Sequence, residues 1–215
     1  MLKRILTELH HHAPFTAAGA LSGIIFMYIF RNVPEHVSHE LFYIFHPVHV
    51  LLSALATAGM YRRYTCPTDR RRCSLLLLLF IGYTGSIGIA TLSDSIMPYV
   101  GEILLNLPHR APHLGFIERW RLISTLAIVG IIIAYVNPST KFPHSGHVLV
   151  STWASLFHIL MAMGENVTWY MYLAIFLFLF LAVWLPCCIS DIIFPLLFIK
   201  NPVIPPPHKS GEKEE

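Results

Sequence analysis

Charged residues are scarce in this sequence. Asp, Glu, Lys and Arg together make up 13% of its 215 residues, whereas a soluble globular domain carries about 25%. Hydrophobic residues make up 55% of the chain. The composition therefore excludes an ordinary soluble domain and predicts an integral membrane protein.

Cysteine is also scarce, and the four cysteines form no standard zinc motif. Cys66 and Cys73 are separated by six residues, which is not a zinc spacing. Cys187 and Cys188 lie in the last hydrophobic stretch, where buried cysteines are commonly inert. The HExxH motif is absent, and the first fourteen residues lack the apolar core of a secretory signal.

Long hydrophobic runs, by contrast, are abundant. About 20 apolar residues are needed for a helix to cross a bilayer, and the runs near that length predict an all-α fold with six transmembrane helices. They are Phe15–Phe30, Val48–Tyr61, Ser74–Met97, Arg121–Val136, His147–Met163 and Tyr170–Phe198. The first two are short, and Ser38–Phe45 is expected to lengthen the second run through a kink at Pro47.

The distribution of basic residues predicts the orientation of these helices. With a cytoplasmic N-terminus, eleven of the fifteen Lys and Arg residues fall inside and four outside, namely Arg31, Arg110, Arg119 and Arg121. Because basic loops favour the cytoplasmic side, both termini are expected there. The basic loop 62–72 is expected to lie near lipid headgroups rather than to bind nucleic acid.

One phrase occurs twice in the chain. His46, His49 and Ser53 recur as His144, His147 and Ser151, at an offset of 98 residues. At the same offset, His11 matches His109 within similar short motifs, and SDSIMP (93–98) matches SDIIFP (190–195) at an offset of 97. Self-similarity at a fixed offset indicates an internal repeat.

The repeat predicts the domain organisation. A His-rich cytoplasmic segment (1–14) precedes the first repeat (15–107) and the second (108–199), and a disordered cytoplasmic tail (200–215) follows. Each repeat holds three predicted spans, an odd number. The second repeat should therefore enter the membrane from the opposite side, which makes the two halves inverted, as in many transporters.

This topology predicts one histidine–carboxylate cluster near each membrane face. The outer cluster draws its side chains from both repeats: His46, His49, Asp94, His109 and His113. The inner cluster contains His144, His147 and Asp191, joined by His11 and its two histidine neighbours in the N-terminal segment.

Histidines three residues apart share one face of a helix and can ligate one ion, with the aspartate as a third ligand. Such a donor set suits a divalent transition metal, with zinc, iron or manganese preferred. Two alternatives stay open: the polar residues can be interfacial helix caps, or they can relay protons. Paired axial histidines for haem are the least favoured interpretation.

Polar residues also follow each histidine pair along its helix. Ser53 and Thr57 continue the face of His49, and Ser151, Ser155 and His158 continue the face of His147. Ser53, Ser151 and His158 are predicted to line an ion path, although small polar residues equally serve helix packing.

The predicted function is transport of a divalent metal ion by a protein embedded in the lipid bilayer, as a monomer or a homo-oligomer. The alternative is a membrane metalloenzyme acting on a lipid or a small apolar substrate. Against transport stands the expected position of the clusters, near the faces rather than at the bilayer midplane. Against the enzyme stands the duplication of sites on opposite leaflets.

Overall fold

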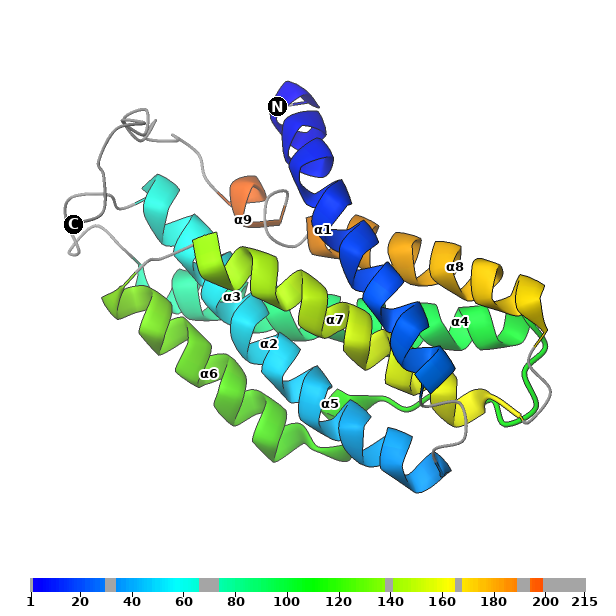
Figure 1. The fold of residues 1–215 in the computed structure, drawn as a ribbon. Helices are drawn as coiled ribbons and strands as arrows, with labels where there is room; N and C mark the ends of the chain where they lie inside the picture. The colour runs from blue at the N-terminus through cyan, green and yellow to red at the C-terminus, as the bar shows by residue number, and fades with distance from the viewer. Residues whose placement is uncertain are drawn as a thin grey trace, which may run out of the picture.

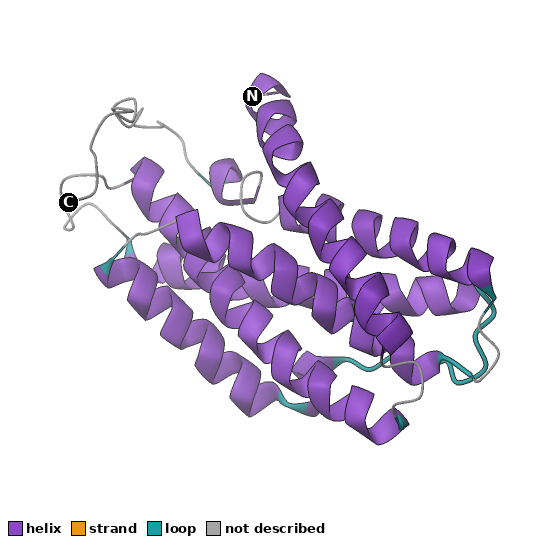
Figure 2. Ribbon diagram, in the orientation of Figure 1, coloured by secondary structure: helices purple, strands orange, loops and turns teal. Residues whose placement is uncertain are grey.

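The computed structural model describes residues 2–29, 34–65, 74–137, 141–164, 168–188 and 194–198. Helices connected by short loops make up these segments, and no strand occurs among them (Figure 2). The all-α prediction is therefore confirmed for the described part of the chain.

The helices follow the predicted hydrophobic runs. Their bounds are α1 (Leu2–Ile29), α2 (Glu35–Thr65), α3 (Leu75–Thr91), a π-helical turn η2 (Leu92–Ile96), α4 (Met97–Leu104), α5 (Gly115–Glu118), α6 (Trp120–Val136), α7 (Lys141–Ala162), α8 (Trp169–Cys188) and α9 (Phe194–Leu197). Since α1 begins at Leu2, the segment predicted as a separate N-terminal region is helical and continuous with the first hydrophobic run.

Three stretches of helix are long and apolar enough to cross a membrane: Glu35–Arg63, Leu75–Leu104 and Trp169–Cys187. Three shorter apolar helices, Thr16–Ile29, Trp120–Val136 and Gly146–Ala162, lie at the other predicted positions. The structure thus supports a membrane protein with three candidate spans.

The outer surface of the bundle is apolar, as expected for a protein surrounded by lipid. Leu173, Leu177, Leu181 and Leu185 recur every fourth residue along α8, and each is between 43% and 56% exposed. Residues at this spacing form one stripe on a helix. A continuous leucine stripe facing outward is unfavourable in water and favourable against hydrocarbon.

Two helices continue through a proline and extend beyond their hydrophobic runs. The helix α2 passes through Pro47 without interruption, so the predicted lengthening of the second run is confirmed. The third run ended at Met97, but helix continues past Pro98 through α4 to Leu104.

The π-helical turn accommodates Pro98. Within it, the Met97 N–H donates to the Leu92 carbonyl oxygen, five residues back. Proline has no N–H to continue this pattern to the Ser93 carbonyl. That carbonyl oxygen instead accepts a hydrogen bond from the Ser155 hydroxyl of α7, at 3.0 Å. The turn also buries Ser93, Asp94 and Ser95, three consecutive polar residues.

The bundle is organised around α2 and α7, which pack against each other. α2 also packs against α3 and α6, and α7 also packs against α1 and α8. Successive long helices run in alternate directions along the bundle (Figure 1). Apolar side chains fill the space on either side of α2: one cluster includes Phe42 and Leu179, and the other includes Val50 and Ile131.

Candidate functional site

The centre of the bundle is a buried carboxylate with four hydrogen-bond donors. Asp94 Oδ2 accepts from His46 Nδ1 at 2.9 Å and from His49 Nδ1 at 2.7 Å. Asp94 Oδ1 accepts from the hydroxyls of Ser93 and Ser151, each at 2.7 Å. All five side chains are essentially inaccessible to solvent. The π-helical turn positions Asp94, and α2 and α7 supply three of its four partners.

This geometry changes the role predicted for Asp94. The sequence suggested a third metal ligand, but both carboxylate oxygens are occupied by hydrogen bonds from neighbouring side chains. A carboxylate that accepts Nδ1–H fixes the tautomer of a neutral imidazole and leaves the lone pair on Nε2. Carboxylates hold metal-binding histidines in this manner. Asp94 is therefore placed to orient His46 and His49.

The carboxylate lies deep within the bundle and not near a face. His49 is fourteen residues from each end of the candidate span Glu35–Arg63, which corresponds to about 21 Å of helix on either side. The hydrophobic run began at Val48, but α2 begins thirteen residues earlier, so His46 and His49 lie near the middle of the helix and not at its start.

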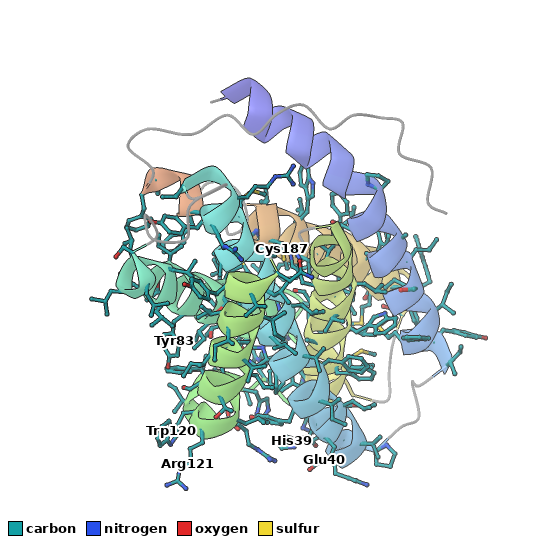
Figure 3. The ribbon with its side chains drawn as sticks, turned by 90° about the vertical axis from the view of Figure 1, so that its left-hand side faces the viewer. His39, Glu40, Tyr83, Trp120, Arg121 and Cys187 are labelled. Atoms are coloured by element: carbon teal, nitrogen blue, oxygen red, sulfur yellow. The ribbon has the colours of Figure 1, made fainter. Side chains whose placement is uncertain are left out.

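His147 and Cys187 complete the centre. The rings of His49 and His147 stack with their centroids 5.8 Å apart and their planes 6° from parallel. The Cys187 thiol lies close enough to both imidazoles to interact with them, and Figure 3 shows this cysteine among the helices of the bundle. His147 was expected in a separate cluster at the opposite face, but packing of α2 along α7 brings it to His49.

His46 is enclosed on the side away from Asp94. Its ring stacks on Phe42 with centroids 5.3 Å apart, and its Cδ2–Nε2 edge packs against Gly115 so closely that a Cβ there would collide with it. His46 Nε2 has no hydrogen-bond partner among the described residues. Gly115 therefore covers the Nε2 edge of the His46 ring.

A second buried ion pair lies two helical turns further along. Glu102 Oε1 and His158 Nδ1 are 2.7 Å apart, and both side chains are buried. Glu102 Oε2 accepts from the Ala111 N–H at 3.3 Å. Phe42 links this pair to His46, because its ring stacks on His46 and makes a T-shaped contact with His158. Glu102 and His158 thus form a second buried polar pair, which lies beside the Asp94 centre along the bundle.

A third group of polar side chains lies at the end of the bundle where α2 begins. His113 contacts His158 edge-on, with ring centroids 5.6 Å apart, and it contacts His39 at 5.7 Å. Glu118 lies beside His113, and its Oε2 accepts a hydrogen bond from the Tyr43 hydroxyl. Partial burial, followed by the neighbouring His158, lowers the pKa of His113, which favours the neutral imidazole.

The remaining predicted residues are placed as follows. His109 is exposed in the loop after α4, and its N–H donates to the Ala162 carbonyl oxygen at 3.1 Å. Ser53 is buried in α2, with no hydrogen-bond partner for its hydroxyl among the described residues. His11 and His144 belong to α1 and α7, but their side chains lie outside the description, as does Asp191 entirely.

Four residues of these clusters were not predicted as ligands: Cys187, Glu102, His39 and Glu118. A signal for Glu102 exists, because it follows Asp94 by eight residues while His158 follows Ser151 by seven. In two helices running in the same direction, these intervals place both pairs at matching heights. His39 lies in the first turns of α2 (Figure 3).

The fold and this core define an all-helical protein with helices of membrane-spanning character and a buried histidine–carboxylate centre. None of the family models, curated proteins or solved structures compared with the chain matches it.

Proposed function

We propose that this protein binds a divalent transition metal ion at the buried centre and carries it across the bilayer. The observation that supports this most is the stacked pair His49–His147 at the middle of a membrane-length helix, with His49 held through Nδ1 by Asp94. Ionisable groups inside a membrane are costly, so they are retained for a function.

The donor set favours zinc among the candidate ions. His49, His147 and Cys187 supply the metal-binding atoms in this proposal, while Asp94 orients the imidazole of His49. Zinc accepts imidazole and thiolate together, whereas manganese prefers oxygen ligands. Cys187 therefore shifts the choice between zinc, iron and manganese towards zinc.

The depth of the centre supports transport. Substrate sites of secondary transporters lie near the bilayer midplane, and the centre lies at the midpoint of α2. Polar side chains also extend from it to one end of the bundle, through Glu102 and His158 to His113. A cation moving between the centre and this end of the bundle could bind these side chains one after another.

The packing of the helices supports the inverted repeat. Exchanging α1 with α6, α2 with α7, α3 with α8 and α4 with α9 converts the contact α2–α6 into α7–α1, and α2–α3 into α7–α8. It also converts α3–α6 into α8–α1, α4–α7 into α9–α2 and α4–α8 into α9–α3. Every one of these pairs is in contact.

The central histidines fit the same exchange. His49 and His147 are equivalent in the repeat and stack on each other, where a two-fold axis relating α2 and α7 would pass. In this proposal His144 and Asp191 are the counterparts of His46 and Asp94, and His11 is the counterpart of His109.

Transport is tested with purified protein in liposomes that contain a zinc-sensitive dye. The wild type is expected to admit zinc, and His49→Ala and His147→Ala to abolish the flux, because each removes one imidazole from the shared pair. His109→Ala is the matched control and should retain the flux, since His109 is exposed on a loop. Absence of zinc, iron(II) and manganese(II) flux in the wild type would reject the proposal.

One observation favours the alternative, a membrane metalloenzyme. The objection to an enzyme was a duplicated site on opposite leaflets, but His147 and His49 share a single centre. A protein that retains bound zinc in liposomes, shows no flux and hydrolyses a lipid would identify this alternative.

A further inference from the structure

Three potential metal ligands converge at the end of the bundle where α2 begins, apart from the central site. They are His39 of α2, His113 of the loop 105–114 and Glu118 of α5. One ligand atom from each lies within 4.8 Å of the other two. We propose that His39, His113 and Glu118 form a second binding site for a divalent transition metal ion.

The spacing of these side chains is close to that of a metal site. His113 Nδ1 and Glu118 Oε1 are 4.0 Å apart, and the rings of His39 and His113 meet at 85° with centroids 5.7 Å apart. A tetrahedral ion with bonds of about 2.0–2.1 Å separates its ligand atoms by about 3.3 Å. Rotations of the three side chains are sufficient to close this difference.

The three side chains are partly exposed to solvent, so an ion can reach them and they can rotate to bind it. The side chains of His39, His113 and Glu118 are 37%, 24% and 41% exposed, whereas the central side chains His46, His49 and Asp94 are at 0%. An ion can therefore reach this group from water without opening the bundle. Partly exposed side chains also retain freedom to rotate towards it.

Hydrogen bonds already orient the carboxylate. The Tyr43 hydroxyl donates to Glu118 Oε2, which leaves Oε1 on the side of His113. The guanidinium of Arg119 lies over the Tyr43 ring, 5.0 Å from its centroid, and helps to hold that ring. Removing a hydrogen bond that orients a metal-binding side chain commonly weakens metal binding 10–100-fold.

The ligand set indicates an exchangeable ion. Two imidazoles and one carboxylate leave the fourth position of a tetrahedral ion open, as in catalytic zinc sites. His113 also contacts His158, which pairs with Glu102. An ion released here would therefore lie beside the polar groups that lead to the centre, so the site suits the capture of an ion from water.

Zinc binding to the full-length protein in detergent tests this site separately from the central one. The background variant His49→Ala/His147→Ala removes the two stacked imidazoles of the centre and is expected to retain one zinc ion per chain in equilibrium dialysis. Adding His39→Ala or His113→Ala should weaken the remaining binding at least tenfold. Adding His36→Ala should leave it unchanged, because His36 is an exposed histidine three residues before His39.

A second variant decides the matter if an alanine variant fails to fold. Tyr43→Phe keeps all three ligands but removes the hydrogen bond to Glu118, so a 10–100-fold weaker affinity is expected in the same background. Cobalt(II) in place of zinc should give the visible absorption of a tetrahedral site, and His113→Ala should remove it.

The outcomes separate this site from the proposed transport. Failure of the background variant to bind zinc, or unchanged binding after His39→Ala and His113→Ala, would overturn the second site even if the wild type transports zinc. If zinc binding follows the expected pattern but the wild type shows no zinc flux, the second site would stand and only the transport proposal would be rejected.

Discussion

At the scale of single residues, Asp94 determines how the centre is arranged. It faces two imidazoles through one oxygen and two hydroxyls through the other, so its charge is fully compensated by donors. The same contacts fix which nitrogen of His49 is protonated. A buried charge that lost these partners would be strongly destabilising, and the histidines in turn depend on the carboxylate for their orientation.

Asp94→Asn tests this role. The amide keeps the size of the side chain but offers a single acceptor oxygen, so it cannot orient His46 and His49 as the carboxylate does. We expect the zinc affinity of the centre to fall 10–100-fold, whereas His49→Ala should remove binding there.

Competition with a zinc-chelating dye measures both effects. The control is Glu40→Gln, which also neutralises a carboxylate, but one that lies on an exposed part of α2. An Asp94→Asn protein that binds zinc as tightly as the wild type would show that the carboxylate has no orienting role.

At the scale of helices, α6 approaches α2 closely, and α2 is the helix that carries His46 and His49. Gly130 of α6 lies against the backbone of α2, where a Cβ would come within 2.5 Å of the Leu51 carbonyl oxygen. Small residues permit such approach in membrane helices. α2 carries His46 and His49, so the contact at Gly130 contributes to the position of both.

Gly130→Ala is expected to force α6 away from α2. Overpacking of this kind costs about 1–3 kcal/mol in unfolding free energy. Gly88→Ala is the matched control, because a Cβ at Gly88 would meet no atom within 4 Å. Thermal unfolding in detergent should show a lower midpoint for Gly130→Ala and no loss for Gly88→Ala; equal midpoints would contradict the tight contact.

At the scale of the whole molecule, the bundle combines a largely apolar outer surface with a line of polar side chains buried in its apolar interior. Buried positions include His46, His49, Asp94, Glu102 and His158, and the outer surface carries apolar stripes such as that of α8. Lipid hydrocarbon offers no hydrogen-bond partners, so in a bilayer buried polar groups have to pair within the protein. The result is a chain of paired polar side chains along the interior.

The orientation in the membrane is predicted from the basic residues and can be measured. In a background lacking the native cysteines, Ser210→Cys is expected to react with an impermeant thiol reagent only after the membrane is permeabilised. Arg110→Cys, in the loop after α4, should react in intact cells. The opposite labelling pattern would show that basic residues do not set the orientation here.

The sequence alone determined where the long helices lie and which histidines belong together. Hydrophobic runs predicted every long helix, because apolar length is a local property of the chain. The Pro47 extension was also predicted, since helix on both sides of a proline can be recognised locally. The repeat identified His46, His49 and His147 as a related set before any contact between them was known.

Tertiary structure alone decided how these residues meet. The direction in which Asp94 points depends on the π-helical turn, which rotates part of one helix relative to the rest. This direction brings the carboxylate to His46 and His49. The stacking of His147 on His49 depends on the register between α2 and α7, and Cys187 approaches them only because α8 packs nearby. Such relations join residues that are 40 to 138 positions apart, and no local pattern in the chain specifies them.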